Sequence, residues 1–147
     1  MIDFVAIDPY LKSKSLRSIL ISKEMAQLGD FLANFIYTAV RMGKNGVIGS
    51  VHVWDYSLRN AMELADLRSQ LGKKMKPDRV ADAAEAFIAY AYLTDLLDLP
   101  QMIEYLSNYL SETDFEVTKR EKEACAKAFS ELLLYIMSLA EKDNRFN

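Results

Sequence analysis

The sequence predicts an all-α fold, and two features of the chain lead to that prediction. Proline occurs only at positions 9, 77 and 100, and glycine occurs only five times, so residues that break helices are rare. Between these breakers, apolar residues recur every three or four positions, which is the spacing of one helix face. Because 147 residues fit one core and no repeat, linker or low-complexity run interrupts them, we expect a single compact multi-helix domain over residues 1–147.

The first two helices are expected over residues 9–21 and 22–42. Ser22 suits the N-cap of the second helix, because its hydroxyl can accept a hydrogen bond from the first turn. Gly43 stands where a C-terminal cap is expected. The polar residues of this second helix fall in one narrow stripe, which consists of Gln27, Asp30, Asn34 and Thr38.

Residues 43–54 are the only break in the helical pattern. Three glycines predict a loop there, with a short extended stretch at residues 51–54. A third helix, capped by Asp55 or Ser57, should then end near Gly72, and a basic connection follows it.

Three more helices complete the expected fold. Asp78 can cap a fourth helix over residues 79–97, and Pro100 suits the first turn of a fifth that ends near residue 110. A sixth helix should begin at Thr113 or Thr118 and continue to about residue 142. Thr118 and Glu121 have the spacing of a capping box.

Composition excludes several classes of protein. The single Cys125 excludes a disulfide framework within the chain, and the single His52 excludes a site built on two histidines. No stretch approaches the roughly 20 apolar residues of a membrane span, so we expect no membrane partner. The N-terminus lacks the order of a signal peptide, and we therefore expect a cytoplasmic location.

Charge is divided unevenly along the chain. Residues 1–79 hold 12 Lys and Arg against 8 Asp and Glu, whereas residues 80–147 hold 6 against 13. The net charge of −3 argues only weakly against nucleic acid, because this division allows one basic and one acidic face. Ordinary solvated surface explains the same division.

Three acids stand out because their helices are otherwise apolar. Asp30 is the only charge within residues 25–40, and Asp82 and Glu85 are the only charges within residues 80–94. A carboxylate in apolar surroundings is costly unless it is paired or binds a metal, so the three acids predict a site for a divalent cation such as Mg²⁺. Two structural explanations remain open: Asp30 can face solvent, and Asp82 can complement the helix dipole.

The same segments resemble a known family. Residues 26–32 (AQLGDFL) look like the "LGD" helix of ribonuclease III catalytic domains, and residues 81–93 (ADAAEAFIAYAYL) look like the second acidic helix of that family. The separation of about fifty residues also fits. The resemblance covers about residues 10–110, and residues 113–142 would form an additional C-terminal helix.

The resemblance implies an all-α endonuclease domain, a compact variant of the ribonuclease III family. Such a domain would form a homodimer and cleave double-stranded or structured RNA. It would use Mg²⁺, for which Mn²⁺ can substitute. By position, Asp30, Asp82 and Glu85 would be the metal ligands. Asp30 and Glu85 would be the principal catalytic acids, and Asp82 would support or orient them.

Two departures from the family pattern bear on activity. Ala26 stands where the family usually has a glutamate, although compact members that also lack this glutamate are nucleases. No double-stranded-RNA-binding domain is expected after residue 110. RNA binding would then rest on the catalytic domain and should be weak and sensitive to salt.

Basic residues precede the second acidic helix and are candidates for binding RNA phosphates beside the metal site. A solvated helix face and loop is the alternative explanation. The candidates are Arg59, Arg68, Lys73, Lys74, Lys76 and Arg79.

Three functions therefore remain in competition. The first is a magnesium-dependent endoribonuclease, and the second is a non-catalytic RNA-binding or assembly module with the same fold, which the substitution at Ala26 favours. The third is a helical dimer that only binds proteins. Metal binding separates the first from the second, and RNA binding at low salt tests the third.

Overall fold

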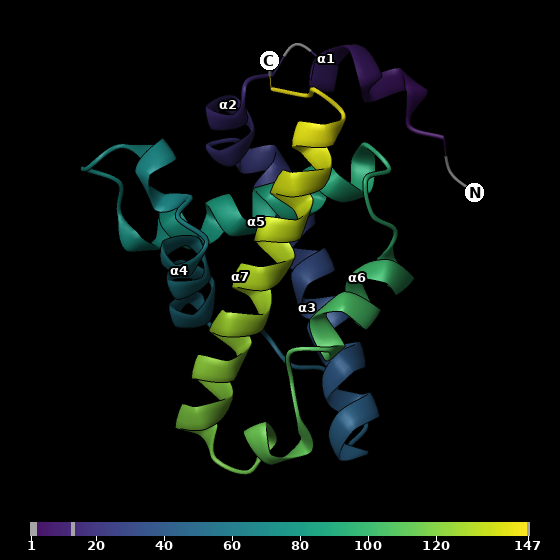
Figure 1. Cartoon of the computed structure of the whole chain (residues 1–147), viewed down its shortest axis with the longest axis vertical. Helices are drawn as coiled ribbons and strands as arrows, with labels where there is room; N and C mark the ends of the chain where they lie inside the picture. The colour runs from purple at the N-terminus through teal and green to yellow at the C-terminus, as the bar shows by residue number, and fades with distance from the viewer. Residues whose placement is uncertain (1–2, 13, 147) are drawn as a thin grey trace.

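The computed structural model describes residues 3–12 and 14–146 and confirms the all-α prediction (Figure 1). These residues form seven α-helices and three short 3₁₀ helices, and no strand occurs among them. The α-helices are α1 (Asp8–Lys12), α2 (Leu16–Leu20), α3 (Lys23–Asn45), α4 (Asp55–Leu64), α5 (Pro77–Leu93), α6 (Leu99–Ser107) and α7 (Thr118–Lys142). The 3₁₀ helices are η1 (Val5–Ile7), η2 (Arg68–Leu71) and η3 (Glu112–Phe115).

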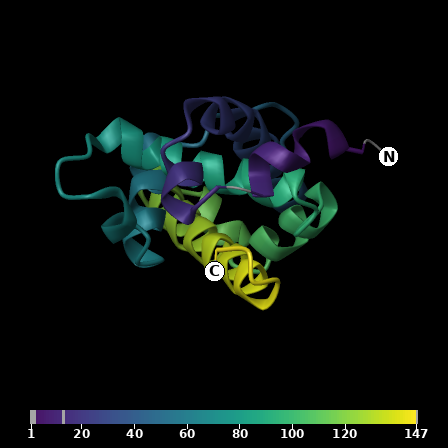
Figure 2. The same cartoon turned by 90° about the horizontal axis from the view of Figure 1, so that it is seen from above.

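Helix α5 lies at the centre of the fold, between α3 and α7 (Figure 2). It also contacts α2 and α4. Alanine dominates its sequence, and the small side chain allows neighbouring helices to approach it on several sides. Six of its alanines are at most 1% exposed: Ala81, Ala83, Ala84, Ala86, Ala89 and Ala91.

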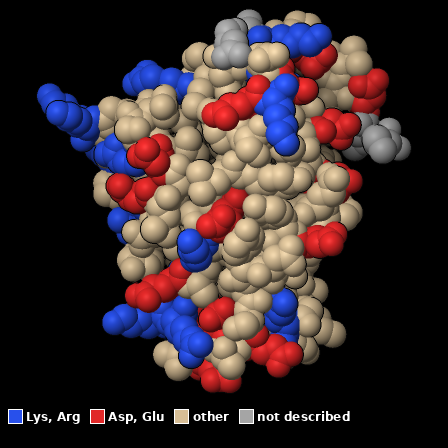
Figure 3. Space-filling view, in the orientation of Figure 1, with Lys and Arg blue, Asp and Glu red and all other residues tan. Residues whose placement is uncertain are grey.

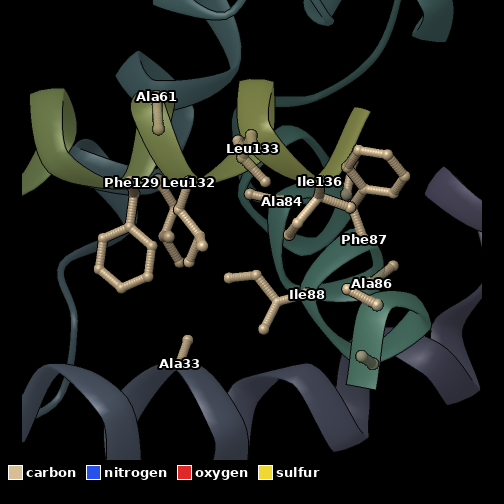
Figure 4. Packing of buried hydrophobic residues seen from close by; sticks show 14 of the residues in the cluster. Ala33, Ala61, Ala84, Ala86, Phe87, Ile88, Phe129, Leu132, Leu133 and Ile136 are labelled. Atoms are coloured by element: carbon tan, nitrogen blue, oxygen red, sulfur yellow. The ribbon is translucent and has the colours of Figure 1, made fainter. Parts of the chain in front are cut away.

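The core fills the space between α3, α5 and α7 (Figure 4). Ile88 of α5 lies between Ala33 of α3 and Leu132 of α7. All three side chains are fully buried. Burial of each large apolar side chain contributes about 1.5–3 kcal/mol, so this layer fixes the position of α5 relative to α3.

Two boundaries differ from the prediction in the first half of the chain. The single helix expected over residues 9–21 is divided into α1 and α2, because Ser15 is an extended N-cap whose hydroxyl accepts a hydrogen bond from the Ser18 backbone. Helix α3 begins after Ser22 as predicted, but it continues past Gly43. It ends at Asn45, and the following Gly46 is its C-cap, with a φ of +74° in the left-handed region.

The remaining boundaries differ by a few residues. Helix α4 ends at Leu64, whereas the predicted helix extends to Gly72. The 3₁₀ helix η2 occupies part of the segment between these two residues. Helix α5 begins at Pro77, because proline fits a first turn that needs no N–H donor, and Lys76 rather than Asp78 is its N-cap. In α6 the prediction for Pro100 is confirmed.

The predicted capping box of Thr118 and Glu121 is wrong. Val117 is the N-cap of α7 and makes no side-chain capping bond. Glu121 turns inward and is only 3% exposed. Its carboxylate accepts hydrogen bonds from the Tyr37 hydroxyl at 2.6 Å and the Arg41 Nε at 2.9 Å, which connects α7 to α3.

Among the described residues, no helix is both long enough and apolar enough to cross a bilayer.

Candidate functional site

The site begins with a close contact between α3 and α5 at Gly29. A Cβ atom at this position would lie 1.9 Å from the carbonyl oxygen of Glu85, which is far inside van der Waals contact. Only glycine therefore allows the two backbones to approach this closely. The contact places Asp30, the next residue on α3, beside Glu85 on α5.

The three acids that the sequence singled out line one open cavity of about 720 Å³. Asp30 comes from α3, and Asp82 and Glu85 come from the first half of α5. Asp55, at the start of α4, and Asp78, in the first turn of α5, are two further acids in this cavity. The other lining residues are Lys23, Ala26, Gln27, Lys76 and Arg79.

Glu85 is the buried member of this group and is only 6% exposed. Among the described residues its one side-chain hydrogen-bond partner is another acid, Asp30. Burial raises the pKa of Glu85 to about 9, and the hydrogen bond and negative charge of Asp30 add to the increase. The charges of Asp82 and Asp55 act in the same direction, so an ionised Glu85 needs a nearby positive charge.

Asp82 is partly buried, and burial raises its pKa also. Arg79, three residues earlier on α5, opposes this increase through its positive charge. The cavity thus combines a group of acids with basic residues at its edge.

The polar stripe of α3 holds the loop that follows it. The Asn34 side chain accepts a hydrogen bond from the Val53 backbone N–H at 2.7 Å. Thr38 Oγ1 accepts a bond from the Val51 N–H at 3.1 Å and lies 3.2 Å from the Val51 carbonyl oxygen. These bonds keep residues 51–53 along α3, although no strand forms there.

Asn34 also connects two side chains beside the cavity. Its Nδ2 donates to Asp30 Oδ1 at 3.3 Å and lies 3.3 Å from His52 Nδ1. The stripe is therefore not simply a solvent-facing surface, since it orients Asp30 and the loop together.

The carboxylates share the cavity without forming a closed cage. Among the described residues, no three His, Cys, Asp or Glu side chains are arranged to ligate one ion as they stand. Among the described residues, Asp30 and Glu85 are the two acids of the group that a side-chain hydrogen bond joins.

Comparison with known families identifies the chain. A family model described as Ribonuclease III matches residues 23–142, which is most of the chain. The chain belongs to the ribonuclease III family. No curated protein matches the sequence. The match runs from the start of α3 to the end of α7, so it includes both acidic helices. It also includes the C-terminal helix α7, which lies outside the resemblance over residues 10–110.

This ribonuclease III chain places its candidate RNA-binding residues in different surroundings. Lys76 and Arg79 line the acidic cavity, and Arg79 Nη2 donates to the Ile21 carbonyl at 3.3 Å. Lys73 and Lys74 are exposed on the connection between η2 and α5. Figure 3 shows Lys and Arg side chains at the edge that this connection forms. RNA binding by these residues stays a prediction.

Two other candidates are set apart from the cavity. Arg68 donates to the carbonyl oxygens of Gly72 at 2.6 Å and Met75 at 3.4 Å, so its guanidinium holds the connection in place. Arg59 is half-buried on α4 and does not line the cavity.

The sequence did not predict Asp55, Asp78 or Lys23 as members of the site. It predicts Asp55 and Asp78 only as helix caps, whereas they lie in the first turns of α4 and α5. The loop before α4 has no periodicity from which its direction can be predicted. The three acids that the sequence did find were recognisable because their own helices are apolar.

Proposed function

We propose that this ribonuclease III-like chain is a magnesium-dependent endoribonuclease that cleaves double-stranded or structured RNA as a homodimer. One observation carries the proposal: among the described residues, the buried acid Glu85 has one side-chain hydrogen-bond partner, and that partner is another acid, Asp30. Two acids placed in this way repel each other when both are ionised. A bound cation reverses that repulsion.

The donor atoms of the cavity suit Mg²⁺. The acids that line the cavity offer carboxylate oxygens as ligands, and neither Cys125 nor His52 lines the cavity. Mg²⁺ binds through one or two carboxylates and keeps several of its waters, so it does not need three side chains around one ion. When bound, the ion would neutralise charge that develops on a phosphodiester and activate water.

The residues of the chain divide this work. Asp30 and Glu85 would hold the ion, and Asp82, one turn from Glu85, would orient its waters. Lys76 and Arg79 would pair with RNA phosphates at the edge of the cavity, as would Lys23.

The exposed apolar face of α3 supports the homodimer. Phe31 is 74% exposed and Phe35, one helical turn later, is 54% exposed. Two adjacent aromatic side chains in solvent are typical of an interaction surface. A second copy that covers them would place its own cavity near the same face, which would give the dimer two acidic sites along one RNA.

Cleavage of a structured RNA with Mg²⁺ tests the proposed activity. We expect Asp30→Asn and Glu85→Gln each to reduce the rate at least 100-fold, because each removes a negative ligand. Glu63→Gln, an exposed change on α4 outside the cavity, should cleave at the wild-type rate. Thermal unfolding of each variant checks that it is folded. Retained cleavage in both cavity variants would contradict the assignment.

A non-catalytic RNA-binding or assembly module is the second candidate. Ala26 favours it, because this residue lines the cavity where the family usually has a glutamate. Titration with Mn²⁺ distinguishes the two candidates. Binding that Asp30→Asn abolishes supports the nuclease, and absence of binding supports the module.

A further inference from the structure

The side-chain amide of Asn34, on α3, is held in one orientation by the loop before α4. Its Oδ1 accepts a hydrogen bond from the Val53 backbone N–H at 2.7 Å. A backbone N–H can only donate, so the branch of the amide that faces the loop must be the oxygen, and the other branch must be the nitrogen. Val53 is buried, and the amide is therefore attached to a fixed part of the backbone.

The amide nitrogen of Asn34 then has two acceptors. Nδ2 donates to Asp30 Oδ1 at 3.3 Å and lies 3.3 Å from His52 Nδ1. Since this nitrogen carries two N–H groups and accepts nothing, His52 Nδ1 is the acceptor, and a neutral His52 carries its proton on Nε2. The amide thus has a partner at each of its polar atoms, and it cannot turn without losing one of them.

These contacts restrict Asp30, which is exposed on α3. An exposed aspartate can adopt several rotamers, and only some of them direct a carboxylate oxygen toward Glu85. Asn34 holds Oδ1 of Asp30 from one helical turn later on α3, and Glu85 on α5 is the other hydrogen-bond partner. We propose that Asn34 is a positioning residue that directs the Asp30 carboxylate toward a cation in the cavity. The inference rests on the proposed function.

The orientation of Asp30 matters because Mg²⁺ demands near-ideal octahedral geometry and tolerates little rotation of a carboxylate ligand. Groups that hydrogen-bond to a ligating carboxylate keep it oriented, and their loss typically weakens metal affinity or activity 10- to 100-fold. Asn34 does not line the cavity. It therefore acts through Asp30 and not as a ligand.

Anchoring of the loop is the competing role of Asn34, because the same amide accepts from Val53. Thr38 separates the two roles. It lies one turn later on the same polar stripe and also holds the loop, but its side chain bonds to the backbone of Val51 and not to an acid. A role confined to the loop predicts equal effects of substitutions at the two positions. A positioning role predicts that Asn34 affects metal binding and Thr38 does not.

Mn²⁺ affinity of the full chain, measured by electron paramagnetic resonance without RNA, tests the proposal. We expect Asn34→Ala to weaken Mn²⁺ binding roughly 10- to 100-fold. Thr38→Ala is the matched control, because it removes a loop contact from the same helix, and its affinity should equal that of the wild type. His52→Ala should also bind as the wild type does, since Asn34 keeps its bond to Asp30 without the imidazole.

Thermal unfolding verifies that each variant is folded. If Asn34→Ala does not fold, Asn34→Leu, which keeps the branched shape of asparagine, is measured in its place with the same expectation. Equal affinity of the folded Asn34 variant and the wild type would overturn the positioning role and leave the proposed nuclease intact. A loss in Thr38→Ala or His52→Ala as large as that in the Asn34 variant would also overturn it. A wild-type chain that binds no Mn²⁺ would overturn the proposed function together with the inference.

Discussion

At the scale of single residues, Gly29 decides whether the site can exist. Its missing side chain lets the backbone of α3 approach the carbonyl of Glu85, and the next residue, Asp30, is then placed against the acid on α5. Gly43 lies in the same helix but has open space around it, so it has no comparable role.

Gly29→Ala should lower the free energy of unfolding by about 3 kcal/mol, because the new methyl group meets backbone that cannot move aside. Urea unfolding measures the change. Gly43→Ala is the control and should raise stability by about 0.5–1 kcal/mol, since alanine favours the helix and contacts nothing. Equal effects of the two substitutions would contradict the close contact.

Glu85 makes the stability of the metal-free chain depend on pH. Its pKa is about 9 in the folded chain against an ordinary 4.5, so the folded state binds a proton more tightly. The stabilising contribution is complete below pH 4.5 and is lost as pH rises through 9. Glu85→Gln should therefore raise stability at pH 9 and should change it little at pH 4.5. Urea unfolding of the wild type and Glu85→Gln, measured at both pH values with a chelator present, tests this prediction. An equal gain in the free energy of unfolding at the two pH values would contradict it.

At the scale of elements, the N-terminal half of α7 is attached to α3 by a buried polar cluster. Glu121 accepts hydrogen bonds from Tyr37 and Arg41, and the Arg41 guanidinium also lies over the Phe115 ring. Ser57 of α4 donates to the Lys122 carbonyl in the same region. These contacts hold α3, α4 and α7 together on the side of α3 away from its start.

Glu121→Ala should lower the free energy of unfolding by about 3–5 kcal/mol, because it leaves Arg41 and the Tyr37 hydroxyl without their buried partner. Thr118→Ala should cost less than about 0.5 kcal/mol, since Thr118 makes no capping bond. Exposed Glu123→Ala is the second control. A large loss of stability in Thr118→Ala would instead support the capping box that the sequence predicted.

At the scale of the whole molecule, exposed apolar residues of α3 lie beside the acidic cavity. The exposed phenylalanines of α3 lie next to Asp30 in the sequence, and the basic connection before α5 borders the same cavity. The proposed dimer through α3 would therefore lie beside the acidic cavity.

Phe31→Ser should convert the proposed dimer to a monomer without loss of folding, because the side chain is 74% exposed within one chain. Small-angle scattering gives the oligomeric state. Leu134→Ser, which alters an exposed apolar residue on α7, should leave the dimer intact. A wild-type monomer, or a dimer that Phe31→Ser does not weaken, would contradict the proposed interface.

The sequence by itself determined most of the helices, the apolar character of the segment that forms α5 and the three acids, because helical periodicity and an isolated charge in an apolar segment are local patterns. It assigned Glu121 to a cap, since local spacing alone does not reveal a partner 80 residues away in Arg41.

Only the tertiary structure decided how the acids meet. The close contact at Gly29 joins α3 to α5, and the hydrogen bonds of Asn34 and Thr38 to the loop bring Asp55 of α4 to the same cavity. Both depend on the distance between backbones that are far apart along the chain. Such distances follow from packing of the whole core, whereas periodicity describes one helix at a time.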